Sequence, residues 1–96
     1  MKYKPLPFYL TIKQSQLHGL GLFSLTEIPK DTTIGMTHIE IENDLIRTPL
    51  GGFINHSEDN NCELFVKEDW DDYIIFNIKT IKNIDKNNEI LLNYDL

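Results

Sequence analysis

The sequence predicts a mostly β fold, built as one domain over residues 1–96. A chain of 96 residues has the size of a single domain and leaves no room for separate cofactor and substrate domains. Short runs rich in β-branched and aromatic residues alternate with turn-forming residues, which is typical of short strands. No segment carries a sustained apolar stripe at the helical period of about 3.6 residues.

In the first half, residues 8–12 and 21–25 are expected to form a pair of strands. The first run is aromatic and β-branched, and the second follows two glycines. Residues 27–31 are expected to form a turn. Apolar alternation then covers residues 34–38 and resumes in the opposite phase over residues 39–41, and such a slip predicts a β-bulge or the junction of two strands.

In the second half, residues 43–52 are expected to form a loop with at most one helical turn, because they contain a proline and two glycines. Residues 63–67 and 73–78 are predicted strands of a hairpin, joined by the polar residues 68–72. The segment 87–94 is predicted as a turn that leads into a last apolar strand.

The charge balance is acidic, with nine Lys+Arg against fifteen Asp+Glu and a net charge of −6. Nucleic acid is not expected as a ligand, because Arg47 is the only arginine and the lysines are scattered. An acidic surface favours a basic partner such as a lysine-rich protein segment. The alternative, that the charge only keeps a small domain soluble, stays open.

Cys62 is the only cysteine, so we expect no disulfide within the chain and no cysteine-rich zinc site, which fits a reducing compartment. The first residues lack the apolar core of a secretory signal, and the apolar runs are too short to span a membrane. The abundance of isoleucine, asparagine and lysine indicates an AT-rich viral or bacterial genome. We therefore expect a cytoplasmic protein, or one inside the host cell if the source is viral.

Three short stretches have patterns that suggest a binding site. The first is His18-Gly19-Leu20-Gly21, where two glycines let the backbone bend tightly and approach a ligand without a Cβ in the way. It is not a nucleotide-binding loop, because no third glycine and no helix follow. A plain β-turn explains this stretch equally simply.

The second stretch is Asn55-His56-Ser57, followed by Asn61-Cys62. A serine–histidine hydrolase is not indicated, because adjacent residues rarely aim at each other and no orienting acid is evident. His56 and Cys62 alone supply too few ligands for a metal site. A capped loop is the structural alternative.

The third stretch runs from Glu89 to Tyr94, where a tyrosine after an apolar strand is by default a core or interface aromatic. Taken together, the order and spacing of Gly-x-Gly-Leu-Phe, then Phe-Ile-Asn-His-Ser-x-x-x-Asn-Cys, then Glu-Ile-x-x-x-Tyr are distinctive. Over residues 8–94 the chain resembles the SET domain of protein lysine methyltransferases, and in particular the minimal viral and bacterial SET proteins.

The resemblance implies a single minimal SET domain, with short strands in small sheets and a pseudo-knotted C-terminal crossing in which the last segment threads under the Asn-His loop. It implies methyl transfer from S-adenosylmethionine to a protein lysine, with S-adenosylhomocysteine as product and no metal. The expected partner is a basic, histone-like protein substrate, and we expect neither nucleic acid nor membrane as a ligand. A homodimer is also expected, because exposed strand edges invite pairing.

The resemblance also assigns roles position by position. Tyr94 would be the catalytic tyrosine that orients the reacting groups, and the cofactor-binding residues would be Gly19, Leu20, Gly21, Asn55, His56 and Tyr94. The lysine channel would be lined by His38, Leu64 and Leu92, although His38 fits a buried histidine with satisfied hydrogen bonds equally well. Because leucines stand where many relatives have a gating aromatic, we expect di- or trimethylation.

One alternative function remains open from the sequence. In relatives, a longer insert before Asn55 forms one wall of the substrate groove, and here only about residues 42–52 are left for it. The short insert and the lack of a second channel tyrosine favour a catalytically silent SET-like module that binds the cofactor or a protein. The intact Gly-x-Gly, Asn-His and tyrosine positions favour an enzyme.

Overall fold

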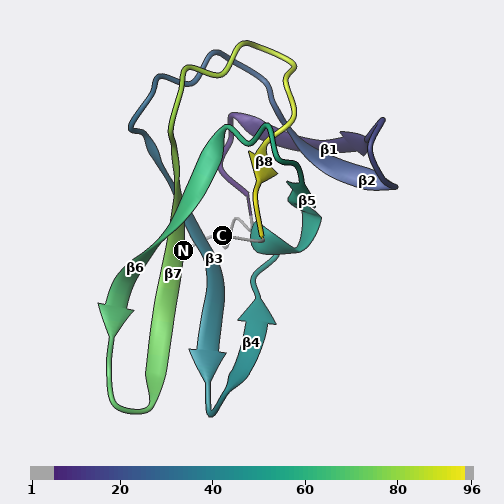
Figure 1. The fold of residues 1–96 in the computed structure, drawn as a ribbon. Coiled ribbons are helices and arrows are strands. Elements are labelled where there is room, and N and C mark those ends of the chain that lie inside the picture. The colour runs from purple at the N-terminus through teal and green to yellow at the C-terminus, as the bar shows by residue number, and fades with distance from the viewer. Residues whose placement is uncertain (1–5, 95–96) are drawn as a thin grey trace.

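The computed structural model describes residues 6–94, and this part of the chain is mostly β, as predicted. Its elements are short strands and one 3-10 turn, in the order β1 (Leu10–Gln14), β2 (Leu20–Ser24), β3 (Thr33–Ile41), β4 (Asp44–Arg47), η1 (Gly51–Phe53), β5 (Asn55–His56), β6 (Cys62–Asp69), β7 (Tyr73–Thr80) and β8 (Leu91–Leu92). They form three small sheets with the strand orders β1-β2, β4-β3-β7-β6 and β5-β8. Figure 1 shows the four-stranded sheet and the β1–β2 hairpin at opposite sides of the molecule.

The predicted pairing of the first two strands is confirmed. β1 and β2 are antiparallel, in a register that places Leu10 opposite Ser24 and Gln14 opposite Leu20. β1 begins two residues later than the start predicted from the aromatic run, because the Leu10 amide donates to the Pro7 carbonyl and closes a turn there. The hairpin loop is therefore the segment that carries Gly19.

The phase slip predicted between residues 38 and 39 corresponds to an irregularity in β3. β3 pairs with β7, and the register shifts between Thr33 and Gly35 and again between Met36 and His38. A bulge places an extra residue on one strand and rotates the following side chains. As a consequence, the consecutive residues Thr37 and His38 are both buried.

The prediction of a loop over residues 43–52 is wrong for its first half. Asp44–Arg47 forms strand β4, which pairs antiparallel with β3 at the edge of the sheet. The connection is a two-residue turn in which Glu42 and Asn43 both have positive φ angles, 50° and 70°, as a type I′ hairpin turn requires. The one helical turn allowed for this segment is η1, which extends to Phe53.

The hairpin predicted from residues 63–67 and 73–78 is confirmed, with longer strands. β6 and β7 pair from Cys62–Thr80 to Asp69–Ile74, and the connection between the two strands comprises only residues 70–72. The Trp70 amide donates to the Tyr73 carbonyl over 2.9 Å and closes this turn. Polar side chains at residues 68 and 69 belong to the strand because β6 is an edge strand with one face open to solvent.

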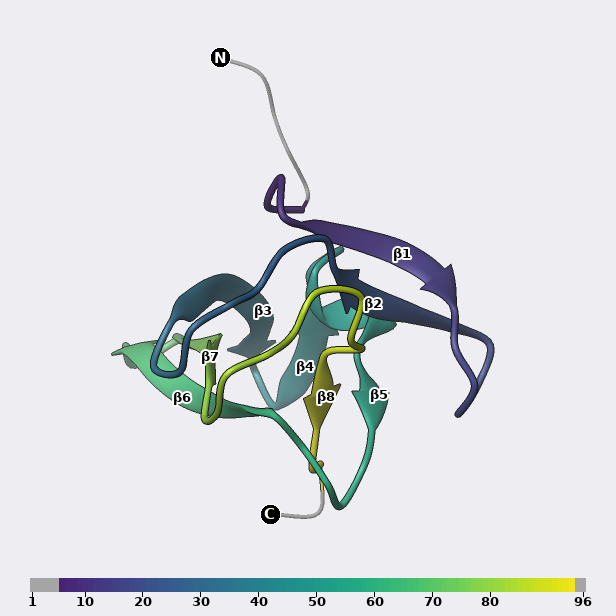
Figure 2. The same ribbon diagram turned by 90° about the horizontal axis from the view of Figure 1, so that it is seen from above.

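The last apolar segment makes the C-terminal crossing. β8 pairs in parallel with β5, with Asn55 opposite Leu91 and His56 opposite Leu92. On one side the Ser57 amide donates to the Leu92 carbonyl over 2.9 Å, and on the other the Asn61 amide donates to the Leu91 carbonyl over 3.3 Å. The connection between β5 and β6 thus passes around the C-terminal strand (Figure 2). This is the threaded arrangement that the family resemblance implies.

The hydrophobic core joins the three sheets. Its buried members come from six strands and from the connections between elements, and they are Leu10, Leu22, Ile28, Ile34, Leu50, Ile54, Cys62, Ile78, Ile84, Ile90 and Leu92. Tyr94 and Phe53 are partly buried against this cluster. Because Leu22 of β2, Ile54 next to β5 and Leu92 of β8 all belong to one core, the three motif stretches are fixed relative to each other. No helix with the length and hydropathy of a membrane span occurs within residues 6–94.

Candidate active site

Asn55 connects the three motif stretches. Its side-chain Nδ2 donates to the carbonyls of His18 and Leu20, over 3.2 and 3.1 Å, and to Glu89 Oε2 over 2.8 Å. The amide group has only two N–H hydrogens, so at least one of them is shared between acceptors. The Asn55 side chain therefore holds the Gly-x-Gly loop against the segment that precedes β8.

Glu89 is the second residue that joins the loop to the C-terminal segment. Its other carboxylate oxygen, Oε1, accepts a 2.8 Å hydrogen bond from Ser15 Oγ. Gly21 lies directly over this carboxylate, since a Cβ at Gly21 would stand 2.9 Å from Glu89 Cδ and 3.1 Å from Ser15 Cβ. Sequence reasoning gave Glu89 no role, although its place at the start of the third motif marks it.

The Gly-x-Gly loop is open at its first glycine only. Gly19 has a φ of +46°, a conformation that favours glycine, and no atom lies within 4 Å of the position where its Cβ would be. Leu20 is exposed. The loop therefore has open space at Gly19, while its carbonyls at His18, Gly19 and Leu20 accept from Asn55 Nδ2 and the Ser15 amide. The role of this loop in binding S-adenosylmethionine stays a prediction.

Tyr94 contacts Ile54 and His56, the two residues that flank Asn55 in the chain. Its hydroxyl donates to the Ile54 carbonyl over 2.9 Å, and its amide donates to His56 Nδ1 over 3.1 Å. The Tyr94 ring is tilted by 32° against the His56 ring at a centroid distance of 6.2 Å. Burial raises the pKa of Tyr94 above its ordinary value, with a smaller opposing effect from Arg47. The hydroxyl therefore stays protonated at neutral pH.

His38 meets the same tyrosine by its edge. The two ring centroids are 6.4 Å apart with an interplanar angle of 81°. His38 is 1% exposed, its Nδ1 is 2.9 Å from Thr37 Oγ1, and its Nε2 has no hydrogen-bond partner among residues 6–94. Burial, and secondly Arg47, lower the pKa of His38. The structure thus places a neutral histidine, with one nitrogen unpaired, against Tyr94.

Arg47 is a further site residue, and sequence reasoning missed it. It is the last residue of β4 and pairs with His38 across the β3–β4 ladder. Its guanidinium carbon lies 5.6 Å from the Tyr94 ring centroid, within cation–π range. The signal that could have found it is the turn-forming Asn43, followed by Leu45 and Arg47 at the two-residue spacing of one strand face. Recognising a hairpin there would have placed Arg47 opposite His38.

The two leucines assigned to the lysine channel lie in different environments. Leu92 is 2% exposed and belongs to the core, two residues before Tyr94. Leu64 lies on β6, at the edge of the four-stranded sheet opposite β4, and is 38% exposed. Of the predicted channel residues, the structure brings His38 against Tyr94. The roles of Leu64 and Leu92 stay predictions.

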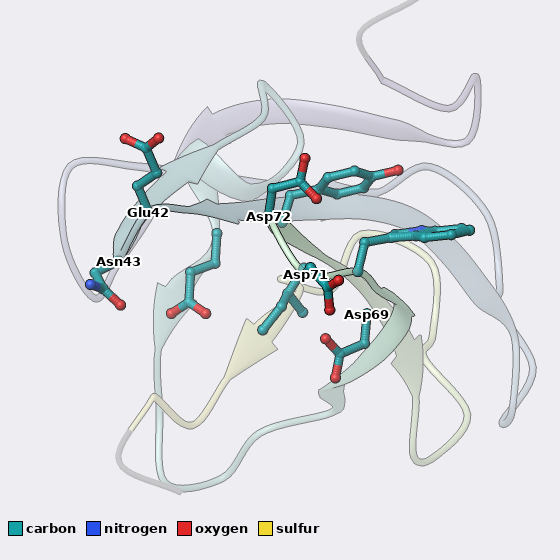
Figure 3. Close-up of a pocket in the computed structure, with 9 residues that line it drawn as sticks. Glu42, Asn43, Asp69, Asp71 and Asp72 are labelled. Carbon is teal, nitrogen blue, oxygen red and sulfur yellow. The ribbon is translucent and has the colours of Figure 1, made fainter.

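An acidic groove lies between the tips of the β3–β4 and β6–β7 hairpins (Figure 3). It has a volume of about 360 Å³ and is lined by Glu40, Glu42, Asn43, Asp69, Trp70, Asp71, Asp72, Tyr73 and Ile74. Trp70 is 57% exposed and stacks on Tyr73 with a centroid distance of 6.3 Å. The groove therefore combines several carboxylates with an open aromatic surface. In the β3–β4 ladder its lining residue Glu40 stands opposite Leu45, two residues before Arg47, a separation of about 7 Å at roughly 3.3 Å per strand residue.

Comparison with known proteins identifies related sequences and folds. A sequence model of the SET domain matches residues 42–95, which is more than half of the chain and includes Asn55, His56 and Tyr94. No curated protein matches the sequence. Within residues 6–94, no group of three His, Cys, Asp or Glu side chains is placed to hold a metal ion.

Two solved structures illustrate the fold similarity. A Plasmodium falciparum protein assigned as a histone methyltransferase is similar with a TM-score of 0.72 and 24% identity, over 90% of this chain and 92% of that one. The Chaetomium thermophilum Polycomb Repressive Complex 2, in an inhibitor-bound humanised form, gives a TM-score of 0.69 and 18% identity over 88% of this chain. The match covers 14% of the Polycomb chain. At these identities, the likeness establishes the fold.

Proposed function

The chain belongs to the SET-domain family, and we propose that it is an S-adenosylmethionine-dependent methyltransferase that acts on a lysine side chain of a protein. The observation that carries the proposal is the set of three hydrogen bonds from Asn55 Nδ2 to His18, Leu20 and Glu89. These bonds connect three distant stretches, and each stretch carries residues that the family resemblance assigns to the cofactor or the reaction.

In the proposed reaction, S-adenosylmethionine supplies an electrophilic methyl group on a sulfonium sulfur, which the lone pair of a neutral lysine amine takes up as the carbon–sulfur bond breaks. Tyr94 orients the amine. Its hydroxyl proton is engaged with the Ile54 carbonyl, so the hydroxyl oxygen can offer only lone pairs to an amine N–H. The raised pKa of Tyr94 supports this role and argues against a role as a base. Catalysis then rests on positioning.

The acidic groove supports a basic protein as the substrate. A net charge of −6 attracts cationic partners over long range, and the carboxylates between the hairpin tips concentrate that attraction at the end of the β3–β4 hairpin, whose Arg47 contacts Tyr94. The exposed Trp70 ring adds a surface on which lysine or arginine side chains can stack. A lysine-rich segment is the partner that fits both features.

Cofactor binding tests the proposal through Asn55. In isothermal titration calorimetry, the wild-type protein should bind S-adenosylmethionine saturably, and Asn55→Ala should weaken binding by about tenfold or more, because the loop loses its tether. Asn60→Ala is the matched control. Asn60 lies in the connection that follows β5, and its Nδ2 donates to the Cys62 carbonyl. This variant should therefore bind S-adenosylmethionine like the wild type.

The outcomes of this titration separate the alternatives. Absence of saturable binding by the wild-type protein contradicts the methyltransferase proposal. Equal weakening by Asn55→Ala and Asn60→Ala removes the specific role of Asn55. Saturable binding without methyl transfer to the protein itself, to histones or to lysate proteins favours the alternative, a SET-like binding module.

A further inference from the structure

Arg47 is an isolated positive charge at the edge of the candidate active site. It is the only arginine of the chain, it ends the exposed edge strand β4, and its guanidinium lies over the Tyr94 ring at 5.6 Å. A guanidinium presents five N–H donors in a planar fork that matches the two oxygens of a carboxylate. The contact with Tyr94 is a cation–π contact with its ring and needs none of these donors in a hydrogen bond.

Those donors have no carboxylate partner among residues 6–94. The ion pairs in this part of the chain are Lys79 with Glu63 and Lys82 with Asp59, both between exposed side chains. Fifteen Asp and Glu residues are present in the sequence, yet the structure directs none of the described ones to Arg47. An exposed guanidinium without a carboxylate partner among residues 6–94 can bind a carboxylate supplied from outside.

Because Arg47 lies beside Tyr94, its positive charge influences which substrate can bring a lysine there. A lysine ammonium that approaches Tyr94 meets a like charge beside the same ring, which disfavours its entry. A substrate that also brings a carboxylate to Arg47 cancels the repulsion and gains a charge-assisted hydrogen bond. A substrate that brings a second cation there increases the repulsion. Such a combination of attraction and repulsion is how interfaces discriminate between similar partners.

We propose that Arg47 is a specificity-determining residue that binds the carboxylate of an aspartate or glutamate next to the target lysine of the substrate. The inference rests on the proposed function, because it assumes that a lysine is delivered to Tyr94. It refines the substrate class. The acidic groove, which begins at Glu40 opposite Leu45 of β4, attracts basic residues farther from the target, whereas Arg47 selects an acidic residue beside it.

Matched peptides test this inference. Three peptides carry one lysine flanked by glutamate, glutamine or arginine and are otherwise identical, and both their Kd in the presence of S-adenosylhomocysteine and their KM for methyl transfer are measured. With the wild-type protein, the glutamate peptide should bind about fivefold more tightly than the glutamine peptide, and the arginine peptide more weakly than both. Arg47→Gln should abolish the advantage of glutamate, Arg47→Lys should keep part of it, and Arg47→Glu should reverse the order.

Lys67→Gln is the matched control, because Lys67 is exposed on the opposite edge strand β6 and its loss changes the net charge by the same amount. It should leave the order of the three peptides unchanged. An unchanged preference in Arg47→Gln, or the same loss in Lys67→Gln, overturns the inference. Peptide selection without methyl transfer contradicts only the proposed function, and transfer without any dependence on Arg47 contradicts only the inference. Absence of peptide binding by the wild type overturns both.

Discussion

The closest backbone approach near the site is made by Gly51, at the start of η1. A Cβ on Gly51 would overlap the Thr37 carbonyl oxygen and stand 2.9 Å from its carbonyl carbon. Thr48 fixes this contact, because its amide donates to the Thr37 carbonyl and its hydroxyl accepts from the Gly51 amide. The turn before Asn55 is therefore seated on the strand that carries His38.

Gly51→Ala should consequently destabilise the fold by about 1–3 kcal/mol, because the obstructing atoms belong to backbone and cannot rotate away. Gly52→Ala is the control, since no atom lies within 4 Å of its Cβ position, and its effect should stay within about 0.5 kcal/mol. Urea unfolding of the two variants checks the difference. Equal midpoints for the two variants would show that the approach of η1 to β3 is not tight.

At the scale of elements, Asn61 closes the C-terminal crossing. Its Nδ2 donates to the Glu89 carbonyl over 2.7 Å, and its Oδ1 accepts from the Leu91 amide over 2.9 Å. Asn61 itself is 9% exposed. The side chain thus replaces a strand partner on the open side of β8, where the parallel pairing with β5 leaves backbone groups without a neighbour.

Asn61→Ala should lower the free energy of unfolding by about 2–4 kcal/mol, because it leaves one donor and one acceptor of the backbone unpaired. Asn60→Ala, at the neighbouring position, removes a single hydrogen bond to the Cys62 carbonyl and should lower the free energy of unfolding by less. Chemical denaturation measures the cost of both changes. Hydrogen exchange at the Leu91 amide should also become faster in Asn61→Ala, and unchanged protection there would contradict the role of Asn61 in the crossing.

The strands also show how much of the fold can be predicted from the sequence. The β1–β2 and β6–β7 hairpins were predictable because each strand has its own run of apolar and β-branched residues. Strand β4 was missed because all four of its residues are exposed and it lies between turn-forming residues, so that only pairing with β3 makes it a strand. Arg47 was missed together with it. The positions of Asn55 and Tyr94 in the motifs were evident, but the contacts that join them depend on the threading of β8.

At the scale of the whole molecule, the core contains a titratable thiol that couples stability to pH. Cys62 is fully buried, and burial raises its pKa to about 12. An unfolded thiol ionises from its ordinary value of 9.0 upward. Between these two values the folded chain holds a proton that the unfolded chain has lost, so stability falls as pH rises. Below pH 9 this contribution to stability is fully present.

Raising the pH from 7.5 to 10 should therefore cost about 1.4 kcal/mol of stability through Cys62. Tyr9 and Tyr94 also have raised pKa values and begin to add to the loss near pH 10. Urea unfolding at the two pH values measures the total, and Cys62→Ala isolates the contribution of the thiol. Cys62→Ala is expected to be less stable than the wild type at pH 7.5, but to lose less stability when the pH is raised to 10. An identical loss in the variant and the wild type would assign the pH dependence to other groups.

In the proposed function, one small β fold gathers distant stretches of the chain around Tyr94 and methylates a lysine. Mass spectrometry of a lysine-rich protein substrate, incubated with S-adenosylmethionine and either the wild-type protein or Tyr94→Phe, tests it most directly. Added methyl groups on lysine are expected with the wild type, up to the di- or trimethyl state. Strongly reduced transfer is expected with Tyr94→Phe, which should still bind S-adenosylmethionine. Equal transfer by both proteins, or none by a wild type that binds the cofactor and the substrate, would contradict the proposed function.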